Sequence, residues 1–270
     1  MGFKIIDGFC FFNEFDMLEM RLKLLFDYVD KFVIVEANKT HAGADKPLNF
    51  PAHAERFRWA AEKIIYYPVQ VDTSQLVMDR KAPGYDPKNP LRIETAQRSV
   101  IINCCAGFDN FDLLVMGDID EIPSREVFEN FRKNDQIRAS VPMACRQEMF
   151  YYNLQYLRLE TWCGSVFSTV GMARHVGTQY LRDRREYYPR LDPGGWHLSY
   201  FADPQGIVAK IQAFSHQEVN RPKFLDSNHI DACIKSGKDL FNRDLQVRKV
   251  GREFFPAYFY DIACNYPHFL

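Results

Sequence analysis

The stretch DLLVMGDIDEIP, residues 112–123, decides the fold of this chain. Its apolar run, residues 112–116, is typical of a short central strand and leads into three acids, Asp118, Asp120 and Glu121. In an extended chain, residues two apart face the same side. Asp118 and Asp120 thus offer hard oxygen ligands suited to Mg²⁺ or Mn²⁺, with a diphosphate completing the shell. The alternative is a solvated turn after a strand.

Upstream of this stretch, apolar strand-like runs alternate with helical patterns. Further strands are expected at residues 4–12, 31–36 and 63–71, the last with Pro68 at its end or on a sheet edge. Helices are expected at residues 14–27 and 93–104, separated by a loop at residues 72–91. This order indicates an α/β fold with a mostly parallel central sheet flanked by helices.

The carboxyl ends of the expected strands are where such a sheet binds ligands. That rule selects residues 13–14, 36–38 and 117–120. Asn13 also fits a helix N-cap, with Asp16 in the capping-box position. The first strand is not followed by GxGxxG, and the chain has no GxxxxGK[ST], so the dinucleotide and P-loop interpretations lose their main support.

The second half of the chain has a different character. Residues 138–172 are strand-like and aromatic, residues 181–190 are basic and tyrosine-rich, and a helix is expected over residues 204–214 with Asp203 as N-cap. No linker-like stretch separates the halves. We therefore expect a single domain over residues 1–270, with a donor half at 1–123 and an acceptor half at 124–270.

Composition bounds the classes of function. With 47% apolar and 15% aromatic residues the chain can build a large core, and 34 Lys+Arg against 35 Asp+Glu disfavours a polycation made to coat nucleic acid. No secretory signal and no uncharged apolar run of roughly 18 residues is present. Seven cysteines without metal-type spacing indicate reduced thiols. A cytoplasmic protein without a transmembrane segment is expected.

Several separate motifs resemble glycosyltransferase family 17, in order, from about residue 5 to residue 245. They are FFNEFDMLEMR (11–21), DYVDKFVIVEAN (27–38), KPL (46–48), DIDEIP (118–123) and GWHLSY (195–200). The resemblance implies a GT-A-like nucleotide-sugar-binding fold, a UDP-sugar donor of the UDP-GlcNAc type, a glycan acceptor, Mn²⁺ or Mg²⁺, and inversion at the anomeric carbon.

Within that resemblance, the acidic residues receive specific roles. Asp120 is the expected direct metal ligand, while Asp118 ligates through water or binds the donor. Glu121 is either a further ligand or part of a salt bridge. The strand ends supply expected donor contacts, with a helix cap or a solvated turn as the alternative in each case. These donor contacts are Asn13, Glu14, Glu36 and Asn38.

Arginines are the expected partners of the diphosphate. Arg98 either reaches the diphosphate or only pairs with Glu94 at i, i+4 on a helix surface. A dense basic cluster, with Arg185 as its representative, is either a phosphate clamp or a solvated loop. The cluster consists of Arg182, Arg184, Arg185 and Arg190.

The GGWH stretch supplies the remaining candidates. Gly194 and Gly195 permit a ligand to approach the backbone, and Trp196 is either a stacking platform for a sugar or a core residue. His197 is a third metal ligand, a polar contact to substrate or a hydrogen-bonded core histidine, and His216 is a second candidate ligand. An inverting transferase needs a general base. Asp203 is the first choice, and the rivals are His197, Glu148 and Glu218.

Two other classes of function use the same features differently. A metal-dependent phosphohydrolase or nucleotidyltransferase could use Asp118 and Asp120, although two-metal sites usually require further acids nearby. A non-catalytic glycan-binding module would rest on the aromatic second half and would need neither metal nor nucleotide.

Overall fold

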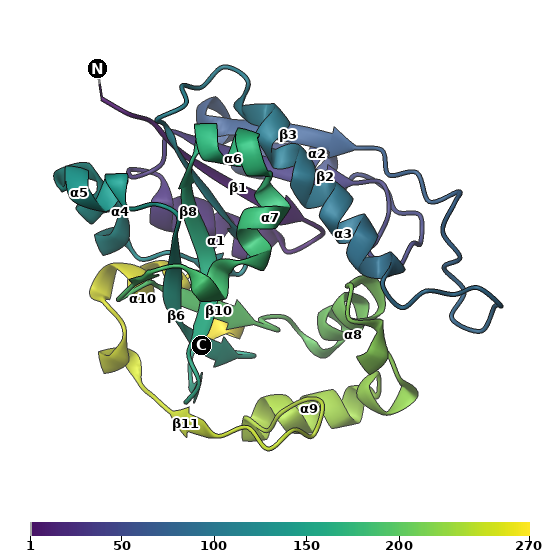
Figure 1. Cartoon of the computed structure of the whole chain (residues 1–270). Coiled ribbons are helices and arrows are strands. Elements are labelled where there is room, and N and C mark those ends of the chain that lie inside the picture. The colour runs from purple at the N-terminus through teal and green to yellow at the C-terminus, as the bar shows by residue number, and fades with distance from the viewer. Residues whose placement is uncertain (1) are drawn as a thin grey trace.

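The computed structural model describes residues 2–270 and forms a mixed α/β fold around one large sheet (Figure 1). The strands are β1 (Ile5–Phe11), β2 (Lys31–Ala37), β3 (Ile64–Val69), β4 (Leu113–Asp118), β5 (Glu121–Ile122), β6 (Met143–Tyr151), β7 (Tyr156–Arg158), β8 (Trp162–Thr169), β9 (Arg190–Leu191), β10 (Trp196–Ser199) and β11 (Val247–Lys249). The α-helices are α1 (Phe15–Leu25), α2 (Asn49–Ala52), α3 (Asn89–Ser99), α4 (Arg125–Lys133), α5 (Asp135–Ala139), α6 (Val170–Val176), α7 (Thr178–Asp183), α8 (Pro204–Ala213), α9 (Ser227–Ser236) and α10 (Ala257–Ala263).

Parallel pairing dominates the first half of the sheet. Strands β3, β2, β1 and β4 lie side by side in that order, and all three ladders between them are parallel. Strand β8 then pairs antiparallel with both β4 and β6, and β6 pairs in parallel with β9 and β10. The predicted α/β class is confirmed, with parallel pairing in the first half of the sheet, and strands of both halves belong to one sheet.

Helices cover both faces of the sheet, which explains why its central strands are apolar throughout. On one face α3, α6 and α7 lie together (Figure 1), with the 3₁₀ helix η2 (Val100–Cys105) continuing α3, and they bury one apolar cluster. On the other face α1, α4 and α10 bury a second cluster. Because both faces are covered, the polar groups of the parallel strands are accessible at the strand ends.

A smaller third cluster lies between β6 and the helices α8 and α9. Ile207 and Ile211 of α8 and Ile230 of α9 pack there with tyrosines that include Tyr151 and Tyr200. These helices form the wall opposite the carboxyl ends of the parallel strands, as the lower part of Figure 1 shows.

Most predicted elements are present, with one local correction. Strand β3 is an edge strand and contains Pro68, and the helix predicted after residue 203 is α8, capped by Asp203 through a 2.7 Å bond from the Gly206 amide to Oδ1. The prediction that Asn13 caps the first helix is wrong. Glu14 directly precedes α1 and turns its carboxylate back to accept from the amides of Phe12 and Asn13 at 3.2 and 3.0 Å.

Across residues 2–270, no helix is long and apolar enough to cross a membrane. All seven cysteines are unpaired thiols.

Candidate active site

The acidic segment, residues 118–121, connects the end of β4 to β5 and is fixed from beneath by one arginine. Arg21 of α1 is fully buried, and its guanidinium donates to both carboxylate oxygens of Asp7 at 2.8 and 2.7 Å. The same group donates to the carbonyl oxygens of residues 118, 119 and 121 at 3.0, 3.2 and 2.7 Å. One buried ion pair therefore sets the path of the segment.

Asp118 lies on the rim of a cleft between two arginines. Its Oδ1 accepts from Arg98 at 2.9 Å and its Oδ2 from Arg182 at 3.0 Å, while the side chain stays 40% exposed. Burial alone would raise the pKa of Asp118, but Arg182 and Arg98 outweigh it and hold the pKa well below its usual range. Each oxygen has one arginine donor and keeps a further acceptor site on an exposed side chain, so the role of Asp118 toward a metal or the donor stays a prediction.

Glu121 points into the protein, as the salt-bridge alternative requires. It is fully buried and pairs with Arg182, and it accepts from the indole Nε1 of Trp162 at 2.6 Å and from the Asp118 amide at 3.1 Å. These donors compensate a carboxylate that would otherwise be costly to bury. Glu121 therefore supports the segment and is not a ligand.

Asp120 faces the opposite way, into the cleft. Its Oδ2 accepts from Lys210 Nζ of α8 at 2.8 Å, and its Oδ1 lies 3.6 Å from Nε2 of His197. Burial would raise the pKa of Asp120, but Lys210 and then His197 lower it below its usual value. Burial would in turn lower the pKa of Lys210, and Asp120 raises it. An ionised carboxylate thus meets a charged lysine across the cleft.

His197 is held in the cleft by its place on β10. Residues alternate along that strand, so Trp196 and Leu198 enter the core while His197 and Ser199 face the cleft. The His197 ring packs 4.9 Å from that of Trp162, and only 8% of the residue is exposed. Its Nδ1 is buried and, within residues 2–270, has no hydrogen-bond partner.

The side chains fit a divalent cation only in part. In the described chain, no group of three or more His, Cys, Asp or Glu side chains is placed to hold one ion. Asp120 and His197 nevertheless share one face of the cleft, where Nε2 of His197 lies 3.6 Å from Asp120 Oδ1; the orphaned nitrogen of the ring is Nδ1, which does not face Asp120. Mg²⁺ is usually bound by one or two carboxylates together with water and substrate phosphates. Asp120 and His197 could therefore hold such an ion beside a diphosphate.

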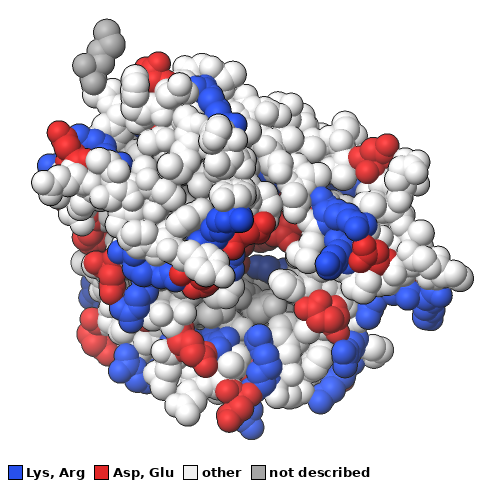
Figure 2. Space-filling model, viewed as in Figure 1, with Lys and Arg blue, Asp and Glu red and all other residues white. Residues whose placement is uncertain are grey.

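Two cavities meet at Asp120. The main cleft has a volume of about 530 Å³ and is lined by the end of β1, by α3, by the acidic segment and by β10 and α8. Figure 2 shows a hollow in the middle of the viewed face with acidic and basic side chains along its rim. The side cavity, about 440 Å³, lies between the start of α1, the start of α8 and residues 268–269. Both cavities are lined by Glu14, Asp120, Tyr200 and Lys210.

The cavities collect most, but not all, of the predicted site residues. The main cleft brings together Glu14, Arg98, Asp118, Asp120 and His197. The side cavity brings Asn13 and Asp203 to the same Asp120. Neither cavity is lined by Glu36, Asn38, Arg185 or Trp196.

Glu36 is a structural residue. It is fully buried, and its carboxylate accepts from Lys46 Nζ at 2.6 Å, the Asn49 amide at 2.6 Å, the Phe50 amide at 3.0 Å and the Tyr66 hydroxyl at 3.0 Å. Four donors satisfy both oxygens. The predicted contact between Glu36 and a nucleoside therefore does not fit the structure.

Asn38 and Arg185 are likewise used within the fold. Asn38 Oδ1 accepts from the Val71 amide at 2.9 Å. Arg185 donates from Nε to the Cys163 carbonyl at 2.8 Å and lies over the Trp162 ring. Neither side chain lines the main cleft or the side cavity, so the predicted donor roles of both residues are not supported. Within the basic cluster, Arg182 is the member that contacts the acidic segment.

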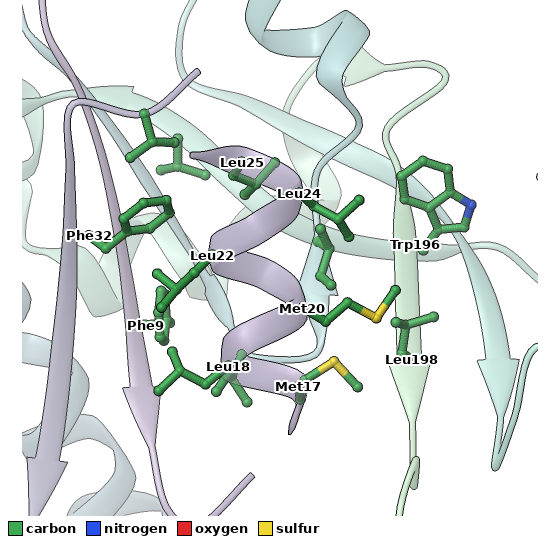
Figure 3. Close-up of a cluster of buried hydrophobic side chains, with 14 of the residues drawn as sticks. Phe9, Met17, Leu18, Met20, Leu22, Leu24, Leu25, Phe32, Trp196 and Leu198 are labelled. Carbon is green, nitrogen blue, oxygen red and sulfur yellow. The ribbon is translucent and has the colours of Figure 1, made fainter. Parts of the chain in front are cut away.

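Trp196 and the glycines before it serve packing. Figure 3 shows Trp196 beside α1 in the core, and its ring lies 4.1 Å from that of Phe259. Gly195 has φ +107°, and a Cβ there would stand 2.1 Å from the Ile122 carbonyl oxygen. The close approach predicted at Gly195 is therefore between two backbone segments, and Trp196 is not a platform for a sugar.

The rival bases and ligands lie in less suitable places. His216 and Glu218 pair with each other at 3.1 Å at the mouth of the main cleft, with side chains 64% and 65% exposed. Glu148 alternates along β6 with Met149, which lines the cleft, so its side chain leaves the other face of the strand.

Two important groups were missed from the sequence, and one had a signal. Asp7 interrupts an apolar strand and Arg21 interrupts the buried stripe of α1, so opposite charges at two core positions could have predicted a buried pair. Lys210 has no such signal, because a lysine beside the apolar stripe of a helix is ordinarily a solvated residue.

The fold and the site together define the class. An acidic segment ends a central parallel strand in the wall of a cleft, which is where an open α/β sheet binds its ligands. The sequence model of glycosyltransferase family 17 matches residues 2–245, and the chain belongs to that family.

Named relatives share the family at low identity. The human protein called beta-1,4-mannosyl-glycoprotein 4-beta-N-acetylglucosaminyltransferase is 26% identical over 267 residues, and its rat counterpart is 24% identical over 265. Each alignment covers 87% of this chain and 48% of the relative, so the chain spans about half the length of the curated relatives it matches.

Solved structures match at 10% identity. A 4-diphosphocytidyl-2C-methyl-D-erythritol synthase gives a TM-score of 0.42 over 78% of this chain and all of that one. S. aureus TarS 1–349 gives a TM-score of 0.39 over 86% of this chain and 69% of that one.

Proposed function

We propose that this chain transfers N-acetylglucosamine from UDP-GlcNAc to a hydroxyl group of a glycan, with a divalent cation and with inversion at the anomeric carbon. One observation carries the proposal. In a chain of family 17, Asp120 leaves the end of β4 to meet His197 and Lys210 in the wall of a cleft. The transferred sugar and the acceptor class come from the names of the relatives, and the UDP carrier is part of the proposal.

The main cleft suits a nucleotide diphosphate in size and charge. Its volume of about 530 Å³ lies within the range of small-ligand pockets. Arg98 of α3 and Lys210 of α8 both line it, Arg98 bonded to Asp118 and Lys210 to Asp120. Cationic side chains on two walls favour a bound diphosphate and stabilise the charge that develops as it departs.

Asp120 and His197 are the residues that would hold the cation, beside the diphosphate. A divalent ion bound there supplies Lewis-acid stabilisation of the leaving diphosphate. Asp118, tied to two arginines, fixes the rim of the cleft and presents its exposed side to the donor.

Inversion requires a base that takes the proton from the attacking hydroxyl group. Asp203 fits this role at the start of α8. The Gly206 amide occupies its Oδ1, which leaves Oδ2 for another partner in the side cavity. His197 remains the second candidate, from within the main cleft.

The test is a transfer assay with Mn²⁺, a panel of UDP-sugars and a glycan panel, with release of UDP as the readout. The wild type should use UDP-GlcNAc, and chelation should abolish turnover. Asp120→Asn should lower turnover by about 10³-fold. Glu218→Gln removes an exposed carboxylate at the same cleft and should leave turnover within about twofold.

Other outcomes would overturn the proposal in identifiable ways. Absence of UDP-sugar binding, with and without Mn²⁺, would refute it directly. Release of inorganic phosphate or pyrophosphate instead of intact UDP would indicate a phosphohydrolase or nucleotidyltransferase. Glycan binding that survives Asp120→Asn and needs no nucleotide would indicate a binding module.

A further inference from the structure

We infer that the side cavity is the acceptor subsite and that it selects an uncharged sugar. The inference rests on the proposed function and adds to it where the acceptor sits and which acceptors are rejected. The side cavity is distinct from the main cleft, but both are lined by Asp120, the residue proposed to hold the cation beside the diphosphate.

Position is the first argument. Asp120 and Lys210 lie where the two cavities meet, so a donor sugar held at that junction would be open to both sides. Inversion requires the nucleophile to attack opposite the departing group. A diphosphate in the main cleft and a hydroxyl group in the side cavity would satisfy that requirement across the junction. A volume of about 440 Å³ is sufficient for a small ligand.

Charge is the second argument. Equal numbers of Lys/Arg and Asp/Glu side chains line the main cleft, so a diphosphate meets cations there. The side cavity is instead lined by one lysine, Lys210, by one histidine, His268, and by four carboxylates, of which Asp16 pairs with His268 and with Arg56. The four are Glu14, Asp16, Asp120 and Asp203. Like charges in contact are costly, so a diphosphate or an acidic sugar is disfavoured in the side cavity.

The chemistry of the lining is the third argument. Carboxylates accept hydrogen bonds from hydroxyl groups, which an uncharged sugar offers on every ring carbon that is free. Phe15 and Phe201 add aromatic surface against which the apolar face of a sugar ring can pack. Asp203 Oδ2 provides an acceptor for the proton of the attacking hydroxyl group. In that step the hydroxyl oxygen bonds to the anomeric carbon, its proton goes to Asp203, and the bond to UDP breaks with both electrons leaving on UDP.

A matched pair of alanines separates the cavities. Ala202 lines the side cavity alone and Ala213 lines the main cleft alone. Binding of two probes is measured by NMR saturation transfer in the presence of UDP and Mn²⁺. The probes are methyl β-D-mannopyranoside and its C6 uronate, which differ by one carboxylate. Affinity for UDP is measured separately by calorimetry.

The wild type should bind the neutral mannoside at least about tenfold more tightly than the uronate. Ala202→Leu should weaken mannoside binding about tenfold or more and leave UDP affinity within twofold, because the added side chain fills only the side cavity. Ala213→Leu should weaken UDP binding about tenfold or more and leave mannoside binding within twofold. Asp16→Asn, at a partly exposed position, should narrow the difference between the two probes without depending on a core substitution.

The inference is overturned if Ala213→Leu, and not Ala202→Leu, abolishes mannoside binding, or if the uronate binds as tightly as the mannoside. Absence of mannoside binding to the wild type also overturns it. If no UDP-sugar binds but Ala202→Leu still removes mannoside binding, the proposed transfer fails while the sugar site stands.

Discussion

The acidic segment is held in different ways on its inner and outer sides. On the inner side Arg21 is fully buried and makes five hydrogen bonds, two to Asp7 and three to carbonyl oxygens of residues 118–121. On the outer side Lys210 crosses the cleft to Asp120 with a single bond of 2.8 Å, and 27% of its side chain is exposed. The inner ion pair is fully buried, so no ligand can replace either partner, whereas the outer pair lines both cavities.

The inner pair and the outer pair therefore have different roles, one in positioning the acidic segment and one in binding ligands. Removing one partner of a buried pair leaves an uncompensated charge and is costly. The outer pair is also largely buried, with 10% of the Asp120 side chain exposed, but it lines both cavities, where a bound ion can compensate a charge that loses its partner. The inner side therefore fixes where Asp120 stands, and the outer side is where a cation or a diphosphate can replace a protein contact.

Breaking the inner side should have the largest effect on stability. Arg21→Met leaves the Asp7 carboxylate buried without a cation and three carbonyl groups without their donor, and it should lower the free energy of unfolding by about 3–5 kcal/mol. Urea unfolding followed by circular dichroism measures the change. Lys23→Met on the same helix removes a partly exposed i, i+4 pair with Glu19, which keeps Arg56 as a partner, and should cost less than about 0.5 kcal/mol. Equal losses in the two variants would contradict a special role for the inner side.

Breaking the outer side should instead change ligand binding. Lys210→Met leaves the Asp120 carboxylate, whose side chain is 10% exposed, with only His197 beside it, and should lower the free energy of unfolding by about 1–3 kcal/mol, less than Arg21→Met does. It should weaken UDP binding about tenfold by removing a cation from the main cleft. It should tighten Mn²⁺ binding, because a cation that competes for Asp120 is gone. Calorimetry with UDP and the electron paramagnetic resonance signal of free Mn²⁺ measure the two affinities.

The opposite signs distinguish this role from a structural one. A structural lysine would weaken both ligands together, so parallel losses of UDP and Mn²⁺ affinity would contradict the exchange. Lys235→Met, at an exposed i, i+4 pair on α9, is the control and should change neither affinity.

Sequence patterns predicted the parts of this molecule that depend on local periodicity. The apolar runs around Phe9, Ile34 and Val115 have the length and composition of buried strands and are buried as strands, and the acids after residue 116 lie at the end of the central strand as expected. The cap at Asp203 was readable because a cap involves neighbours three residues apart.

The misassigned residues all depend on partners far along the chain. Glu36 ends a strand, as a ligand-binding carboxylate would, but a segment ten to fourteen residues later folds over it and supplies three of its donors. Trp196 faces the core because β10 pairs with β5 and β6, a choice of register that nothing in its own segment reveals. Lys210 meets Asp120 across 90 residues. Pairings of this kind come from topology, which local periodicity does not encode.

The smallest expected effect concerns Glu94, which pairs with the same arginine, Arg98, as Asp118 does. Its replacement tests how much this ion pair contributes to the free energy of unfolding as the pH falls. Burial alone would raise the pKa of Glu94, but Arg98 and then His41 outweigh it and lower the pKa. A depressed pKa stabilises the fold above the unfolded value of about 4.3 and loses that stabilisation as pH falls through the folded value. The free energy of unfolding of the wild type should therefore be about 1 kcal/mol larger than that of Glu94→Gln between pH 5 and 7. The difference should shrink below about pH 4, and urea unfolding across this range measures it. A difference that stayed constant down to pH 3 would show that the variant loses packing and not charge.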